Sequence, residues 1–197
     1  NQTMTQGAGV WSFNGSHVTL IQCDVRGNVV TPGGVGGAGL CCFSGDITLD
    51  NTTVEQNVVD VNSKGSGALV TSGATLVVQD SNFSSGSEDP QSNIHVETGS
   101  LTIFLNGSSV DTIISEDTGT RIEFVADSST DVSDDIIPPE DGAMIMEIGE
   151  LVSGYPILLC TGEIVQQGCL TLTNPSETLL ESRVGDYIDL ITADSFS

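Results

Sequence analysis

The chain has 197 residues, which is enough for one domain or for a run of stacked repeats with an appended segment. Its 27 acidic residues outnumber 4 basic ones, and the formal charge of −23 argues against nucleic acid or an anionic membrane as a partner, because phosphates and lipid headgroups would not be neutralised. Hydrophobic residues make up 38% of the chain and recur at ordered positions, which excludes a disordered acidic tail, and no apolar run is long enough for membrane insertion.

Three similar stretches, 7–28, 37–57 and 66–86, have apolar positions that recur at a constant spacing. The matching positions are Val18, Ile47 and Leu76; Leu20, Leu49 and Val78; Val25, Val54 and Phe83; and the small residues Cys23, Thr52 and Ser81. Apolar and polar residues alternate between turn residues, which is typical of strands. Since units of this size cannot bury a core alone, the sequence predicts an all-β solenoid, a parallel β-helix of about 29 residues per coil.

A fourth coil is expected with a small deletion in the polar segment 87–91. With the spacing shortened by two positions, Val96, Ile103, Leu105, Ser108 and Val110 match Leu69, Leu76, Val78, Ser81 and Phe83. Ile122 and Phe124 are expected to start a shortened fifth coil. The acidic run 127–135 and the prolines that follow it should break the pattern, so the coils are assigned to residues 1–135.

Residues 136–197 are predicted to be a β-rich continuation, formed either by further coils or by a small sandwich-like segment. Four strands are expected in this part, at 143–148, 156–160, 169–173 and 187–192. The one candidate for a helical stripe in this part is a short one at 176–182. The sequence begins with Asn1, so we expect a processed chain or an excerpt of a longer one.

Five cysteines occur without a CxxC pair or an accompanying pair of histidines, so no zinc site is expected from them. Cys23 and Cys42 are predicted to face inward in neighbouring coils, where a disulfide is sterically feasible. Cys160 and Cys169 flank a short segment with glycines and could close a hairpin. Disulfides would indicate an oxidising compartment, whereas the alternative is that these residues are buried free thiols that pack as small apolar side chains.

Five asparagines begin an N-x-[ST] sequon, and four of them are the candidate glycosylation sites: Asn14, Asn51, Asn82 and Asn106. The last three fall at turns or on outward phases of the predicted strands, where a glycan fits. In a eukaryote they would indicate a secreted glycoprotein, and in a bacterium the motif would mean little.

Short motifs recur in register with the coils. Gly-Ala-Gly-Val at 7–10, Gly-Ala-Gly-Leu at 37–40 and Ser-Gly-Ala-Leu at 66–69 resemble the Gly-Gly-Ala-aliphatic motif of polymorphic outer-membrane-protein repeats. Val-Arg-Gly-Asn at 25–28 and Val-Glu-Gln-Asn at 54–57 resemble the Phe-x-x-Asn motif of that family, with Val in place of Phe. The resemblance extends to about position 110 and implies a right-handed parallel β-helix that is displayed at a cell surface for adhesion or assembly.

The end of the chain and the coil corners carry further signals. The closing segment 185–195 resembles the tail segments of autotransporter-like passengers. Independently of any family, Asn28 and Asn57 should stack one coil apart and form a ladder of side-chain amides. Glycines 9, 39 and 67 should supply corners where φ is positive or where backbone approaches backbone.

Catalysis is an alternative, because pectate-lyase and polygalacturonase enzymes share this kind of coil. Such chemistry needs a basic residue beside clustered carboxylates, and the basic residues available are Arg26, Lys64, Arg121 and Arg183. None of them recurs with acidic neighbours on a shared face. His17 and His95 are expected on the outer surface, so the sequence predicts no catalytic, cofactor-binding or metal-binding residue and no enzyme.

Calcium is the ion to weigh against the acidic residues of this chain. Asp127, Asp131, Asp134 and Asp135 form a carboxylate-rich segment whose oxygens suit calcium. The segment lacks the glycine and closing Glu of an EF-hand and the repeats of calcium-binding solenoids, so we expect a solvated loop.

The sequence therefore predicts an extracellular or cell-surface structural module, part of a larger adhesin, fibre or surface assembly and non-catalytic. Its expected partners are other copies of itself or other subunits, because the open ends of a solenoid need capping or extension. The alternative is a carbohydrate-active (pectin-lyase-like) enzyme or a glycan-binding β-helix. A glycan-binding groove usually offers exposed aromatic side chains, and Trp11 is the only tryptophan, which counts against this alternative.

Overall fold

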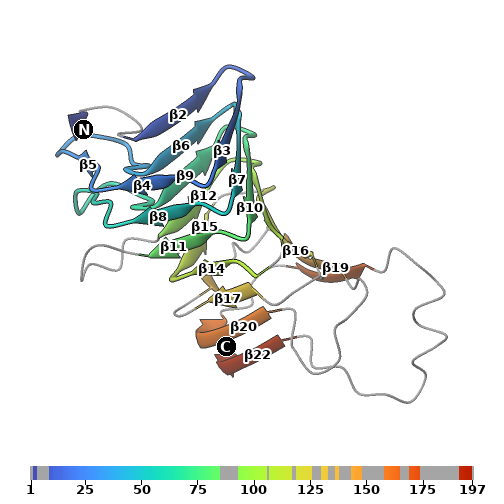
Figure 1. The fold of residues 1–197 in the computed structure, drawn as a ribbon. Helices are drawn as coiled ribbons and strands as arrows, with labels where there is room; N and C mark the ends of the chain where they lie inside the picture. The colour runs from blue at the N-terminus through green and yellow to red at the C-terminus, as the bar shows by residue number, and fades with distance from the viewer. Residues whose placement is uncertain are drawn as a thin grey trace, which may run out of the picture.

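The fold is a β-solenoid in which parallel strands stack coil upon coil, as seen in a computed structural model (Figure 1). The structure describes residues 2–3, 9–84, 93–105, 107–116, 119–125, 130–132, 136–137, 143–147, 158–164, 169–173 and 191–196, with side chains between 9 and 137. All regular elements in these ranges are strands. The described residues include no helix with the length and apolar character that a membrane span requires.

Each coil contributes strands to three walls. The first wall is built from β2 (Val10–Phe13), β6 (Leu40–Phe43), β9 (Ala68–Thr71), β12 (Ile94–Val96), β15 (Ile113–Ser115) and β18 (Ile136–Ile137). The second wall is built from β3 (His17–Ile21), β7 (Asp46–Asp50), β10 (Thr75–Gln79), β13 (Leu101–Leu105), β16 (Arg121–Val125), β19 (Ala143–Glu147) and β21 (Cys169–Thr173). The third wall is built from β4 (Asp24–Arg26), β8 (Thr53–Glu55), β11 (Asn82–Ser84), β14 (Ser109–Val110) and β17 (Thr130–Val132).

Four strands complete this arrangement. β20 (Leu158–Ile164) pairs with β17 and β18, so it joins the first and third walls, and β22 (Ile191–Phe196) pairs with β20. At the other end, β1 (Gln2–Thr3) pairs with β5 (Val29–Val30). The C-terminal strands thus extend the sheets that the earlier coils begin.

The predicted apolar columns are confirmed by the strand register. Ile47 pairs with Val18 on one side and with Leu76 on the other, which confirms the predicted spacing of the first three coils. Leu49 occupies the matching place between Leu20 and Val78, and the third-wall column of Val25, Val54 and Phe83 is also in register. In the middle coils the side chains of these columns, such as Ile47, Leu49, Leu76 and Val78, are fully buried, and burial of each aliphatic side chain contributes about 1.5–3 kcal/mol.

The corner between the second and third walls is held by a ladder of side-chain hydroxyls. The backbone N–H of Cys23 donates to Thr52 Oγ1 (3.3 Å), and that of Thr52 donates to Ser81 Oγ (3.0 Å). The N–H of Ser81 donates in turn to Ser108 Oγ (3.4 Å). Because each hydroxyl also donates to a backbone carbonyl, the polar groups of the turn are satisfied from one coil to the next.

The fourth coil differs from the prediction by one residue along β13. Thr102 pairs with Leu76 and Phe104 pairs with Val78, so these two residues face the core. Ile103, which the sequence pattern places there, faces outward. A shift of one residue moves every side chain of a strand to its other face, so the predicted register was wrong here.

The same difference begins one strand earlier. Val96 pairs with Val70 and not with Leu69, so β12 and β13 both lie one position away from the predicted register, which is restored at β14. The observed register is consistent with aromatic packing, since the ring of Phe104 stacks on that of Phe124 in the next coil at 5.3 Å and 12°. The predicted fifth coil is confirmed, with Phe124 in β16.

The acidic run 127–135 is not a simple break in the pattern. Strand β17 lies inside it and pairs with β14, and Thr130 and Val132 face inward while Asp131 is exposed. An aspartate on the outward phase of a strand keeps its hydration, so acidity alone does not end the coil. The short helical stripe considered at 176–182 lies outside the described residues.

The cysteines of the first coils are free thiols: Cys23, Cys41 and Cys42. The predicted bridge between Cys23 and Cys42 was wrong, because the two residues belong to different columns. Cys23 lies at the corner beside Thr52, whereas Cys42 lies in β6 beside Val70 of the first wall. A disulfide needs Cα atoms within about 7 Å, which only neighbours in one column or in facing positions provide.

The hairpin expected around Cys160 and Cys169 does not form. Cys160 lies in β20, and Cys169 lies in β21 of the second wall, so the two strands belong to different sheets. The side chains of both cysteines lie outside the described residues.

Candidate functional site

The outer face of the first wall carries charged, imidazole, thiol and aromatic side chains close to one another. Two outward columns run along it from coil to coil. The first column contains Trp11, Cys41, Leu69, His95 and Ile114. The second contains Phe13, Phe43 and Thr71, and it continues to Glu97 and Glu116, which directly follow β12 and β15.

This outer face is covered along its middle coils. Leu69 is fully buried and His95 is only 3% exposed, although both point away from the solenoid core. The chain just before β9 lies against the neighbouring coil, since Lys64 forms a parallel bridge with Gly36 and its carbonyl accepts from the N–H of Gly37 at 3.0 Å. The expectation that His95 lies on the surface was therefore wrong.

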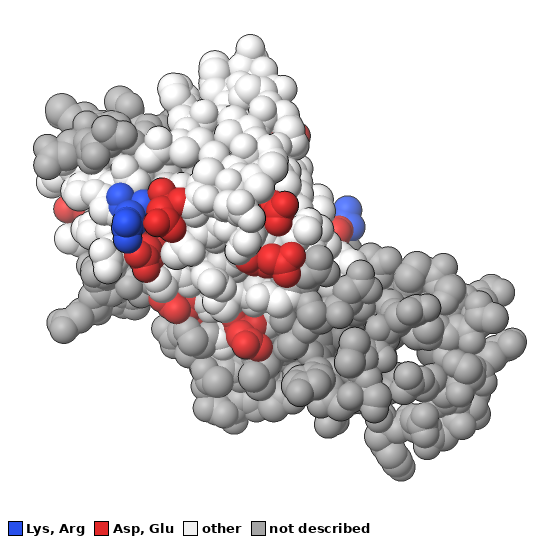
Figure 2. All heavy atoms as spheres, in the orientation of Figure 1, with Lys and Arg blue, Asp and Glu red and all other residues white. Residues whose placement is uncertain are grey.

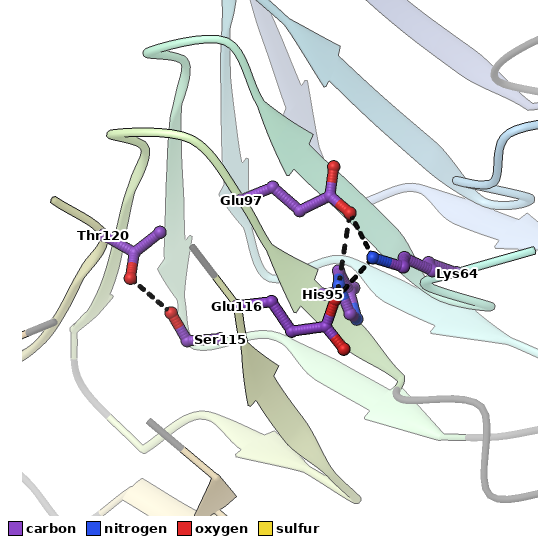
Figure 3. Close-up of polar contacts among 6 residues, drawn as sticks. All are labelled: Lys64, His95, Glu97, Ser115, Glu116 and Thr120. Atoms are coloured by element: carbon purple, nitrogen blue, oxygen red, sulfur yellow. Dashed lines mark hydrogen bonds and ion pairs between the residues drawn. The ribbon is translucent and has the colours of Figure 1, made fainter. Parts of the chain in front are cut away.

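Lys64, His95, Glu97 and Glu116 come together on this face, and we call them the Lys64 cluster (Figure 3). The Lys64 ammonium donates to Glu97 Oε1 at 2.7 Å and to Glu116 Oε2 at 2.5 Å. His95 Nε2 lies 3.4 Å from each of these two oxygen atoms. Three consecutive coils thus direct one cation, one imidazole and two carboxylates at a single point.

The environment of the cluster holds both carboxyl groups in their charged form. A hydrogen bond with His95, followed by that with Lys64, outweighs burial and lowers the pKa of Glu97 to about 2. The hydrogen bond from Lys64 likewise lowers the pKa of Glu116. Burial lowers the pKa of Lys64, but its hydrogen bonds to both glutamates outweigh this, and the net pKa is raised.

Sequence reasoning missed the Lys64 cluster because its members are far apart in the chain. Lys64 is 33 positions before Glu97 and 52 positions before Glu116. The available signal was the register of the fourth coil. Pairing Val96 with Val70, as the structure does, places His95 in a covered column and Glu97 just beyond it.

The other cations on the described side chains are also paired. Arg26 lies 3.6 Å from Asp24 and 3.5 Å from Glu55, and Arg121 pairs with Glu123. Figure 2 shows acidic side chains spread over the middle of the visible face, with few charges toward the end where β2 and β3 lie. Arg183 lies outside the described residues.

Three aromatic rings form a row at the N-terminal end of the first wall. The ring centroids of Trp11 and Phe13 are 5.3 Å apart, and those of Phe13 and Phe43 are 5.8 Å apart. Trp11 is 50% exposed and Phe13 is 49% exposed. Exposed aromatic rings of this kind stack on apolar faces of ligands or on partner proteins.

The predicted structural ladder has a definite geometry. Asn57 Oδ1 accepts hydrogen bonds from the backbone N–H and from the side-chain amide of Asn28, both at 3.0 Å. Asn57 Nδ2 donates to the carbonyl of Val25 at 2.8 Å. Beside this ladder, a Cβ atom on Gly39 would lie 2.5 Å from the carbonyl oxygen of Gly67, so close approach of backbones is what requires glycine at this position.

The sequon asparagines and the acidic segment fall in different surroundings. Asn14 and Asn51 are exposed at turns with φ of 56° and 50°, and Asn82 is exposed in β11. Asn106 lies outside the described residues. Of the four aspartates considered for calcium, Asp131 is exposed in β17, and the other three lie outside the described residues.

Comparisons with known proteins found no match to a family model, a curated protein or a solved structure. The chemistry of the described side chains and the form of the solenoid are therefore the basis for assigning a function.

Proposed function

We propose that this chain is a non-catalytic structural module of an extracellular or cell-surface assembly, an adhesin, a fibre or a related structure. The observation that carries the proposal is the N-terminal end of the described coils. Val10, Val18 and Leu20 pack against the core but remain only partly buried there. Their strands β2 and β3 each pair on one side only among the described residues, which leaves apolar side chains and strand edges available to a further coil.

The chemistry of the cluster favours a scaffold over a catalyst. A general base near neutrality needs a pKa near the working pH, and the pKa of Glu97 is held at about 2. The Cys41 thiol has its pKa raised to about 12, primarily by burial, so it is a poor nucleophile. The resemblance of the motifs at 7–10 and 37–40 to polymorphic outer-membrane-protein repeats supports a surface protein, and other copies or other subunits are the proposed partners.

Sedimentation of the 197-residue chain over a range of concentration and salt tests this function. We expect reversible association that strengthens with salt, because the charge of −23 opposes contact between copies and salt screens it. Leu20→Lys should abolish the association. Thr19→Lys is the matched control, because it makes the same change of charge on the exposed side of the same strand. A monomer under all conditions, or equal loss in both variants, would contradict assembly from copies of this chain and leave other subunits as its proposed partners.

A second candidate, a glycan-binding or pectin-lyase-like β-helix, is favoured by the row of Trp11, Phe13 and Phe43. Binding to acidic and neutral polysaccharides, measured with the unmodified chain and with Trp11→Ala, tests it. Saturable binding that Trp11→Ala removes would favour glycan recognition over assembly. Turnover of polysaccharide that one carboxylate substitution abolishes would establish an enzyme.

A further inference from the structure

We propose that His95, Glu97 and Glu116 form a binding site for a divalent transition metal, best suited to Zn²⁺, and that the Lys64 ammonium competes for the same position. This site is independent of the proposed assembly function, and neither depends on the other. Its three ligand atoms are His95 Nε2, Glu97 Oε1 and Glu116 Oε2, which all lie within 4.8 Å of one another.

The separations between ligand atoms fit a small tetrahedral ion. His95 Nε2 is 3.4 Å from Glu97 Oε1 and 3.4 Å from Glu116 Oε2. Ligands at about 2.0 Å from a tetrahedral Zn²⁺ are separated by roughly 3.3 Å, so two edges of the tetrahedron already have the required length. The two carboxylate oxygens are also the atoms that Lys64 Nζ contacts, which shows that this point selects positive charge.

The backbone presents the three ligands from rigid elements. His95 lies within β12, and Glu97 directly follows that strand on the same outward side. Glu97 N donates to Val70 O at 2.8 Å, and Glu116 N donates to Val96 O at 2.9 Å, so both glutamates are fixed to the sheet of the first wall. Ligands that are fixed before binding lower the entropy cost of holding a metal.

The ligand set distinguishes among metals. One imidazole nitrogen with two carboxylate oxygens suits Zn²⁺ and neighbouring transition metals, whereas Ca²⁺ and Mg²⁺ prefer oxygen ligands alone. Three protein ligands leave a fourth tetrahedral position for water. Among the described residues, the group of ligand atoms that lie this close together contains no cysteine, so Cys41 is not part of the site.

Lys64 sets the affinity of this site. Its side chain is 38% exposed and flexible, so the ammonium can turn to solvent when a metal enters. That movement breaks two charge-assisted hydrogen bonds and therefore weakens metal binding in the unmodified protein. Removing the ammonium leaves two carboxylates beside an imidazole with no competing cation, which should strengthen binding.

Competition with a chromogenic zinc chelator at neutral pH tests the proposal on the full chain. We expect one equivalent of Zn²⁺ to bind, Glu97→Gln and Glu116→Gln to weaken binding at least tenfold, and Lys64→Met to tighten it at least tenfold. Glu123→Gln is the matched control, because Glu123 pairs with Arg121 on the second wall and should leave the affinity unchanged. Circular dichroism checks the fold, and the half-exposed Glu116 is the substitution least able to disturb it.

Co²⁺ gives a second readout that does not depend on the stability of the variants. The bound ion should show the visible bands of four-coordinate cobalt without the near-ultraviolet charge-transfer band of a thiolate ligand. A thiolate band would place the metal at a cysteine and overturn the proposal. The proposal is equally overturned if Glu97→Gln, Glu116→Gln and Lys64→Met bind Zn²⁺ with the affinity of the unmodified chain.

Discussion

Lys64 Nζ lies 2.5 Å from Glu116 Oε2, although the two residues are 52 positions apart in the sequence. The solenoid creates this contact, because Lys64 precedes β9 and Glu116 follows β15 two coils further on. Stacking of coils thus assembles one polar cluster from segments that share no local motif, and the cluster fixes the chain before β9 over the outer face of the first wall.

Acid should weaken the folded state through Glu97. Its pKa is about 2 in the folded protein against an ordinary value of 4.5, so its stabilising contribution is complete above pH 4.5 and is lost as the pH falls toward 2. Between pH 7 and pH 3 this loss amounts to about 2 kcal/mol. Urea denaturation should show that the unmodified protein loses about 2 kcal/mol more over this interval than Glu97→Gln does. Equal losses in the two proteins would show that the carboxylate is not held in this way.

Thr102→Val should stabilise the protein. Thr102 is fully buried between Leu76 and Ile122, and its Oγ1 has no hydrogen-bond partner among the described residues. Removing a buried hydroxyl without a partner should raise the free energy of unfolding by about 1 kcal/mol.

The matched control for this substitution is Thr120→Val. Thr120 Oγ1 accepts a hydrogen bond from Ser115 Oγ at 2.7 Å, so the same change there should lower the free energy of unfolding (Figure 3). Thermal or urea unfolding of both variants gives the comparison. If Thr102→Val has no effect, Thr102 faces outward and the register predicted from the sequence applies instead.

Asn57→Ala should destabilise the first two coils. The substitution leaves the buried N–H of Asn28 and the carbonyl of Val25 without these partners, at a cost of about 1–3 kcal/mol. Asn82→Ala is the control, because Asn82 is exposed and its Oδ1 accepts one hydrogen bond, from Ser109 Oγ at 2.8 Å. Equal free energies of unfolding for the two variants would mean that the amide ladder does not stabilise the coils.

Material from the native source should carry N-linked glycans if the chain is a secreted eukaryotic protein. Asn14 and Asn51 are exposed at turns and can accept a glycan without clashing with the sheets. Intact-mass analysis before and after enzymatic deglycosylation should show a loss of mass, and Asn51→Gln should reduce that loss by one glycan. An unchanged mass would remove the sequons as support for an extracellular location.

Much of the fold could be predicted from the sequence because the coils repeat their packing. Ile47 and Leu76 occupy equivalent core positions in successive coils, so the spacing between them in the sequence predicts how the coils stack. The fourth coil could not be placed correctly, since both Ile103 and Phe104 are apolar and the alternation alone does not choose between them. In the structure Phe104 faces the core and its ring stacks on that of Phe124 in the next coil.

The Lys64 cluster and the state of the cysteines depend on contacts across coils, which the repeat does not encode. Lys64 has Gly36 as its counterpart in the preceding coil, and Glu97 stands in line with Phe43 and Thr71, so neither charge is predicted by the earlier repeats. A bridge between Cys23 and Cys42 was predicted only because both were expected to face inward. A disulfide also requires that the two residues share a wall or face one another, and both are free thiols.

The stacking of coils is tested most directly by methyl NMR of the chain with labelled Leu and Val and with protonated Phe. Neighbouring strands are about 4.8 Å apart, so nuclear Overhauser effects should connect Leu20 with Leu49 and Leu49 with Val78, but not Leu20 with Val78. Val78 should also contact the ring of Phe104. A strong effect between Leu20 and Val78, or none from Leu49 to either, would contradict the solenoid.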